Sequence, residues 1–255
     1  MKNKYLLSAT LFVLSFSFRS FMNAQANIDI ESGAVFTGYN NVRIPGDAGT
    51  IFSLKTDLNA RPNAYIRIRA GYKIKSRQTI SFLYAPLLVK SNGTTNKQID
   101  FEGVTFPSNT SLNASYKFNS YRITYRYDIV KRSKIEFGLG FTAKIRDAEV
   151  AINREGLTTS KKNVGFVPII NFRLNWKMND KIGLLFEGDA LAAPQGRAED
   201  VLFAGTYTFS EQFLVRLGYR ILEGGADNDE VYNFALFHYA SVGMTYTFKN
   251  KLKSN

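Results

Sequence analysis

Apolar and polar residues alternate one by one along most of this chain, and that period of two constrains the fold more than any other feature. In the segment 121–129 the apolar residues hold the odd positions, while Arg122 and Arg126 stand at even positions. Successive side chains of a strand point to opposite faces, so the pattern predicts strands with one apolar and one polar face. No stretch after Ala26 approaches the roughly 20 apolar residues of a membrane-spanning helix. We therefore predict an all-β fold.

Ten segments follow the alternation closely enough to be predicted as strands. They are 28–39, 64–74, 79–90, 112–129, 134–150, 164–177, 181–190, 199–209, 212–222 and 232–248. The predicted connections alternate between short turns, at 75–78, 130–133, 178–180 and 210–211, and longer loops, at 40–63, 91–111, 151–163, 191–198 and 223–231. This layout is typical of antiparallel transmembrane β-barrels. We predict about ten strands. The apolar segment 51–54 of the first loop is expected to plug the barrel mouth or to add a short strand, which would make eight or twelve the alternative counts.

A soluble β-sandwich or a lipocalin-like barrel would also alternate, with its apolar face turned inward. Here the apolar face carries large aromatic residues near the short-turn ends of many strands: Tyr72, Tyr125, Tyr127, Phe137, Trp176, Phe209, Phe213, Tyr246 and Phe248. Aromatic residues at one level across many strands indicate an interfacial girdle. The opposite face carries glycines, at 138, 140, 218 and 243, which leave room inside a narrow barrel. We favour the transmembrane barrel over the soluble folds.

The first 26 residues are predicted to be a secretory signal peptide. Lys2 and Lys4 precede an uncharged stretch at 5–18, and Ala24 and Ala26 supply the small residues of a cleavage site. Cleavage after Ala26 would leave 27–255 as the barrel domain. The alternative is a retained membrane anchor, but the apolar stretch is short for a spanning helix.

The last predicted strand ends in a motif with Gly243, Tyr246 and Phe248 at fixed spacing. This segment, 241–248, resembles the terminal β-signal of bacterial outer-membrane proteins. The resemblance implies recognition by the barrel-assembly machinery, through an edge strand that pairs by backbone hydrogen bonds. It also implies the outer membrane of a Gram-negative bacterium, with the bilayer and lipopolysaccharide as partners. Segments 141–149, 189–201 and 218–239 resemble uncharacterised small outer-membrane proteins and imply no activity.

The polar face is predicted to line the lumen. Its site candidates are Arg67, Arg69, Arg122, Arg126, Glu136, Lys144, Arg146, Arg173, Glu187, Asp189, Arg216 and Arg220, and the same face carries Asp29, Glu31, Lys73 and Asp128. One interpretation is a network of ion pairs that fills the lumen. The other is a narrow pore or pocket with a positive field that favours anions.

A second set of charged residues is expected at the extracellular mouth: Asp147, Glu149, Arg197, Glu199, Asp200, Asp227, Asp229 and Glu230. Such runs are most often solvated turns. Alternatively they bind calcium, bridge to lipopolysaccharide phosphates or act as a general acid and base. The segment 227–230 lacks the spacing and glycine of an EF-hand loop, and no metal is expected.

Known catalytic patterns are missing from the chain, which has no cysteine and a single histidine. His238 is expected to face lipid rather than to act as a base. The sequence contains no nucleotide-binding or hydrolase motif, so we expect no cofactor and favour a barrel without catalysis. Its function would be structural or narrowly solute-interacting. The alternatives are an enzyme acting on lipid A or surface peptides through the loop carboxylates, and a surface-loop adhesion protein.

The net charge of +12 would ordinarily suggest nucleic acid as a partner. The positive excess, however, gathers at the short-turn side, at Lys73, Lys75, Arg77, Lys131, Arg132, Lys134, Lys177, Lys181, Lys249, Lys251 and Lys253. We expect these residues to lie beside anionic phospholipid headgroups and expect no nucleic acid.

Overall fold

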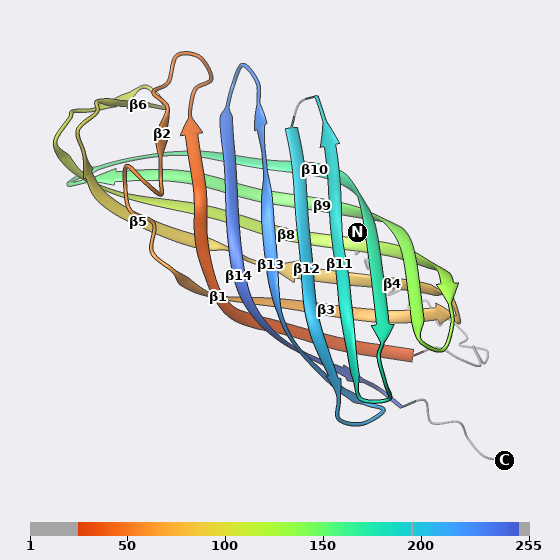
Figure 1. Ribbon diagram of the computed structural model, residues 1–255. Coiled ribbons are helices and arrows are strands. Elements are labelled where there is room, and N and C mark those ends of the chain that lie inside the picture. The colour runs from red at the N-terminus through yellow and green to blue at the C-terminus, as the bar shows by residue number, and fades with distance from the viewer. Residues whose placement is uncertain (1–24, 195, 250–255) are drawn as a thin grey trace, which may run out of the picture.

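The computed structural model describes residues 25–194 and 196–249, which form one closed antiparallel β-barrel (Figure 1). Each long strand pairs with the next one along the chain. The last strand, β14 (Tyr232–Thr247), pairs with the first, β1 (Gln25–Arg43), and this pairing closes the sheet. The predicted signal peptide lies outside the described residues, except for Gln25 and Ala26 at the start of β1. Of the described residues, none belongs to a helix long and apolar enough to cross a membrane.

Ten strands build the wall, as the sequence predicts. Between β1 and β14, the sheet contains β2 (Phe52–Ser53), β3 (Asn63–Lys75), β4 (Gln78–Ala85), β5 (Leu88–Thr95), β8 (Thr110–Lys131), β9 (Ile135–Arg154), β10 (Leu157–Lys177), β11 (Ile182–Ala193), β12 (Gly196–Thr208) and β13 (Phe213–Asp227). β4 and β5 both pair with β8 and form one wall strand, interrupted at Pro86 and Leu87. The 12-stranded sheet therefore has ten wall strands once β4 and β5 are counted together and the short β2 is set aside. A separate hairpin, β6 (Ile99–Phe101) and β7 (Val104–Phe106), lies in the second loop.

The two ends of the barrel differ. We call the end with the four short turns the turn end and the opposite end, with β2 and β6, the loop end (Figure 1). The predicted long loops at 151–163, 191–198 and 223–231 are wrong, because most of their residues continue the strands β9–β10, β11–β12 and β13–β14. Ladder hydrogen bonds need only a neighbouring strand, so pairing continues where the outward side chains become polar and the apolar alternation ends.

The outer face of the wall is apolar. Ile123, Phe203 and Leu217 are 56%, 55% and 71% exposed, whereas the inward Arg122 and Arg220 are each 2% exposed. Apolar groups outside and charges inside reverse the arrangement of a soluble protein, so the sandwich and lipocalin-like alternatives are wrong. The wall therefore presents a lipid-facing belt.

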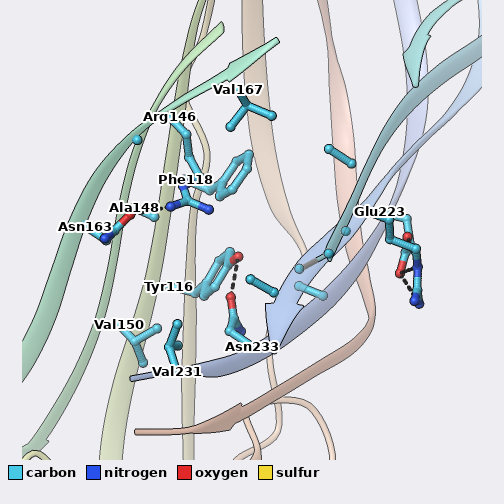
Figure 2. A pocket seen from close by; sticks show the side chains of 18 of the residues that line it. Tyr116, Phe118, Arg146, Ala148, Val150, Asn163, Val167, Glu223, Val231 and Asn233 are labelled. Atoms are coloured by element: carbon cyan, nitrogen blue, oxygen red, sulfur yellow. Dashed lines mark hydrogen bonds and ion pairs between the residues drawn. The ribbon is translucent and has the colours of Figure 1, made fainter. Parts of the chain in front are cut away.

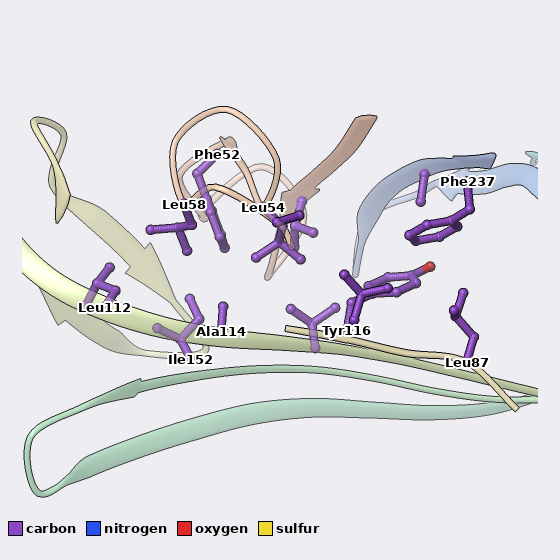
Figure 3. Packing of buried hydrophobic residues seen from close by; sticks show 14 of the residues in the cluster. Phe52, Leu54, Leu58, Leu87, Leu112, Ala114, Tyr116, Ile152 and Phe237 are labelled. Atoms are coloured by element: carbon purple, nitrogen blue, oxygen red, sulfur yellow. The ribbon is translucent and has the colours of Figure 1, made fainter. Parts of the chain in front are cut away.

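The loop end of the lumen is filled by an apolar cluster (Figure 3). Phe52, Leu54 and Leu58 of the first loop pack against wall residues such as Leu112 and Ile152, and none of the five is more than 2% exposed. Residues 52–53 also form β2 against β1. The segment thus both plugs the mouth and adds a short strand, without changing the number of wall strands.

Gly243 of the terminal motif points into the lumen against the guanidinium of Arg216. A Cβ at position 243 would lie 2.3 Å from Cζ of Arg216, which is 4% exposed and binds Glu31 at 2.9 Å. We expect Gly243→Ala to displace this buried side chain and to lower the free energy of unfolding by about 1–3 kcal/mol. Urea titration followed by heat-modifiable gel migration measures the change. Gly205→Ala is the control, because the nearest atom to its Cβ is 4.0 Å away; equal losses would contradict the steric explanation.

Candidate functional site

A layer of ion pairs occupies the middle of the lumen. Arg220 donates to both carboxylate oxygens of Glu31, at 2.7 and 2.8 Å, and to Asp200 at 2.5 Å. Asp200 also binds Arg67 at 2.8 Å and Arg122 at 2.6 Å. These five side chains are at most 5% exposed. Each charge has at least one opposite partner, which offsets the cost of removing it from water.

The same layer reaches the opposite wall. Asp189 accepts hydrogen bonds from Arg122 at 2.6 Å and from Asn171 at 2.9 Å. Nearer the turn end, Arg69 binds Glu187 at 2.8 Å. The ion pairs and hydrogen bonds therefore join β1, β3, β8, β10, β11, β12 and β13 across the lumen. They form a transverse layer with a separate cavity on each side.

The turn-end cavity is small and polar, with a volume of about 170 Å³. Arg126, Arg173 and Glu136 line it, and Arg126 lies 3.6 Å from Asp128. It shares no lining residue with the larger cavity at the loop end. This separation follows from the ion-pair layer between them.

The loop-end cavity has a volume of about 490 Å³ and is mostly apolar (Figure 2). Tyr116, Phe118, Val150 and Phe237 contribute rings and methyl groups to its wall. The Tyr116 hydroxyl donates to Asn233 at 3.2 Å, so this polar group is satisfied by the protein itself. Two predicted lumen residues, Lys144 and Arg146, are among its cations, whereas Lys161 and Arg197 at its rim are paired with Glu102 and Glu223.

Lys144 is a buried cation without a carboxylate partner among the described residues. It is 2% exposed, and its ammonium nitrogen lies 4.8 Å from the ring centroid of Phe118. Asp189 and Asp200 are each bound by Arg122 in the ion-pair layer. A cation–π contact offsets only part of the cost of burying a charge. An anion bound beside this ammonium would supply the opposite charge that the protein itself does not.

Arg146 adds a second cation two residues further along β9. Its Nη2 donates to the side-chain oxygen of Asn163, and its buried Nε has no hydrogen-bond partner (Figure 2). Arg146 therefore has a free N–H donor on the same inward face of β9 as Lys144, where an anion would bind. An alkyl chain attached to that anion would meet the apolar wall.

The residues expected at the extracellular mouth lie in four different places, and Asp200 is the one of them that lies inside the lumen. Asp147 and Glu149 point outward from β9 and form ion pairs with Lys117 at 3.0 and 3.5 Å. Arg197 also faces outward and binds Glu223 at 2.8 Å, while Glu199 shares that face of β12. Asp227, Asp229 and Glu230 are exposed at the turn between β13 and β14. Among residues 25–194 and 196–249, no group of three or more His, Asp or Glu side chains is arranged to hold a metal ion.

Asp200 corrects the prediction, since it belongs to the ion-pair layer and not to the mouth. It lies on the inward face of β12 with Leu202 and Ala204, and it is 3% exposed. A strand that starts at 199, as predicted, would place Asp200 one residue from its end and therefore at the mouth. β12 in fact begins at Gly196, which places Asp200 well inside the wall.

The apolar lining of the loop-end cavity differs from the charged lumen that the sequence predicts. A signal for it exists on β8, where the inward positions hold Leu112, Ala114, Tyr116 and Phe118 before Ser120 and Arg122 take over. The apolar residues thus change from even to odd positions along one strand. That change marks the height at which the interior becomes apolar.

A closed antiparallel barrel with an apolar belt outside and paired charges inside is an integral outer-membrane β-barrel protein. Both the predicted fold class and the predicted outer-membrane location are confirmed.

Among solved structures, one outer-membrane barrel agrees with this fold at a TM-score above 0.5. The chain is similar to the outer-membrane protease OmpT of Escherichia coli, with a TM-score of 0.54 and 12% identity over 91% of this chain and 99% of that one. Ail, the attachment invasion locus protein of Yersinia pestis, gives a TM-score of 0.40 and 9% identity over 88% and 99% of the two chains. Neisserial surface protein A gives 0.37 and 15% identity over 89% and 99%. No family model and no curated protein matches the sequence.

Proposed function

We propose that this barrel binds a single-chain anionic amphiphile in the loop-end cavity and conducts no ions through its lumen. The ligand is an alkyl chain with a carboxylate or phosphate headgroup. The buried ammonium of Lys144, which forms no ion pair with a carboxylate in a mostly apolar cavity, is the observation that carries the proposal. The cavity volume of about 490 Å³ falls within the range of small-molecule sites, roughly 300–1,000 Å³.

The ion-pair layer supports the absence of conduction. A permeating ion would have to pass between Arg220, Glu31 and Asp200, whose charges already neutralise one another at 2.5–2.8 Å. This supports the interpretation of the lumen as a filled network rather than a pore. Two of the carboxylates considered for an enzyme, Asp147 and Glu149, are paired with Lys117 on the outer wall, which does not favour the enzyme alternative.

The proposal includes the assembly of the barrel and its orientation in the outer membrane. The terminal motif with Gly243, Tyr246 and Phe248 supports assembly by the barrel-assembly machinery of a Gram-negative bacterium. The basic turn end supports an orientation with the short turns in the periplasm, beside anionic phospholipid. The loop end would then face outward, at the lipopolysaccharide leaflet.

A ligand series with one chain and three headgroups tests the binding. Dodecanoate, dodecanol and dodecylammonium share the apolar part and differ only in charge. We expect the affinity of the amphipol-held barrel to fall in that order, with the carboxylate at least 10-fold tighter than the alcohol, because a charge-assisted hydrogen bond is worth about 1.5–3 kcal/mol. Calorimetric titration measures the affinities. Equal affinity for the three compounds would contradict an anion site, and stepwise currents in planar bilayers would contradict a closed lumen.

A further inference from the structure

The wall of the barrel is not hydrogen-bonded along its full height between β10 and β11. β10 pairs with β9 from Leu157 to Trp176, but it pairs with β11 only from Ile170 to Lys177. Above the Ile170–Ala190 pair, the edge of β10 that faces β11 has no strand partner. In Figure 1 the β9–β10 hairpin also sweeps away from β11 and β12 at the loop end. We call this unpaired interval the β10–β11 gap.

A proline lies at the base of the gap. The backbone N–H of Lys177 donates to Lys134 on the β9 side. Backbone groups of successive strand residues point to opposite sides, and the register with β9 is unbroken, so even-numbered residues of β10 direct theirs toward β11. Pro168 therefore lacks its N–H on the side of the gap. Proline within sheets is found at such unpaired edges, and here it opposes closure of the seam.

The base of the gap lies at the height of the lipid-facing belt. Val164 and Phe166 point outward from β10 at 69% and 65% exposure. The next outward residue toward the loop end, Lys162, is charged and lies 3.6 Å from Glu149. The gap thus starts in the hydrocarbon of the membrane leaflet at the loop end and continues toward its surface.

The loop-end cavity reaches both edges of the gap. Its lining includes Gly165 and Val167 from β10 and Leu191 and Ala193 from β11, all small or apolar. Lys144 pairs with Val167 in the β9–β10 register, so the unpaired cation lies on the strand next to the gap. An amphiphile that entered through the gap would bring its headgroup to Lys144 directly.

A second unpaired interval, between β3 and β5, differs from this one. Residues 60–63 cross it, with a bridge between Ala60 and Ser91 and a hydrogen bond from the backbone N–H of Arg61 to Lys90. The cavity beside it measures only about 10 Å³. Only the β10–β11 gap combines an unpaired edge with a large cavity in the described part of the chain.

From these observations we propose that the β10–β11 gap is a lateral portal, through which a single-chain anionic amphiphile passes between the membrane and the loop-end cavity. The proposal rests on the binding function proposed above and adds the route and the source of the ligand. A route through the membrane suits an alkyl chain, because the chain then never crosses the polar loop end or water. The apolar cluster fills the loop end of the lumen beside this cavity.

The portal is tested by bridging its two edges. Val167→Cys and Ala193→Cys place thiols on the inward faces of the two edges, and the chain has no native cysteine. A short bis-maleimide then spans the gap. The matched control bridges Ala151→Cys and Ser160→Cys, which are already paired across β9 and β10, so its bridge leaves the gap open.

The readout is quenching of a tryptophan in the cavity wall. Trp176 is the single native tryptophan, so Trp176→Phe with Phe237→Trp reports on the cavity alone. Dibromostearate is added in lipid vesicles that carry the barrel. We expect rapid quenching in the unbridged protein and in the control, and a rate at least 10-fold lower with the gap bridged. A bridged protein that is quenched as fast as the control would overturn the portal and leave the binding function intact.

Two further outcomes are informative. One separates failure of the binding function from failure of the portal, and the other separates membrane lipid from a free amphiphile as the source of the ligand. Absence of quenching in the unbridged protein, together with equal affinities across the dodecyl series, would overturn the binding function and the portal together. Vesicles of phosphatidylcholine with brominated chains form the second arm. Quenching by these anchored chains would support entry of the acyl chains of membrane lipids themselves. Quenching by dibromostearate alone would support a free single-chain amphiphile as the ligand.

Discussion

Replacing Arg220 with methionine is expected to destabilise the barrel by about 3–5 kcal/mol. The guanidinium makes bonds of 2.5–2.8 Å to Glu31 and Asp200, and all three side chains are at most 3% exposed. Methionine leaves both carboxylates in the lumen with fewer positive partners, and uncompensated buried charge is the main cost of breaking such a pair. Urea unfolding in lipid vesicles, followed by the fluorescence of Trp176 and by gel migration, measures the loss.

The matched control for this variant is Arg197→Met on the neighbouring strand. Arg197 also forms a bidentate pair, with Glu223, but its side chain is 47% exposed on the outer wall. Glu223 is only 10% exposed, but it keeps the hydrogen bond from the Tyr39 hydroxyl when Arg197 is lost. A loss of about 1 kcal/mol, smaller than for Arg220→Met, is therefore expected. Equal losses from the two arginine variants would show that the ion-pair layer does not hold the barrel together.

Replacing Lys144 with methionine is expected to have opposite effects on binding and on stability. The affinity for dodecanoate should fall about 10- to 100-fold, the equivalent of one charge-assisted hydrogen bond, while the affinity for dodecanol stays unchanged. The free energy of unfolding should rise by about 1–3 kcal/mol, because the variant no longer buries an unpaired charge at 2% exposure. Calorimetric titration and urea unfolding of one preparation give both values.

Lys117→Met separates the cavity from the general charge of the protein. Lys117 lies on β8 but points outward, where it pairs with Asp147 at 3.0 Å. Its loss changes the net charge as Lys144→Met does, so a general electrostatic effect would lower dodecanoate binding in both variants. We expect only Lys144→Met to lower it. A less stable Lys144→Met barrel with undiminished dodecanoate binding would contradict the anion site.

The wall was predictable because the alternation of side chains is a local property. The strand predicted at 112–129 corresponds to β8 at Thr110–Lys131, and the one at 164–177 to the last two thirds of β10. Strand ends at the loop end were not predictable, since the outward residues there, such as Lys162, are polar and break the apolar period while the ladder continues. The error at Asp200 has the same origin.

The candidate site was only half predictable. Lys144 and Arg146 were predictable as lumen candidates, because they stand two and four positions after Thr142 and so share its face of the strand. Lys144 lacks a carboxylate partner, whereas Arg220 has several. This difference depends on which side chains from other strands meet each residue at its level of the lumen. From the alternation alone, Lys144 and Arg220 are equally good candidates for a lumen site.

The sequence by itself determined the strands, their inward and outward faces and the closed transmembrane wall, because each follows from neighbouring residues and the period of two. The tertiary structure alone decided which charges meet. Arg220 and Glu31 are 189 positions apart and come into contact only when β14 pairs with β1 and closes the barrel. Only closure leaves Lys144 unpaired beside an apolar cavity, and only the divergence of β10 from β11 opens that cavity toward the membrane.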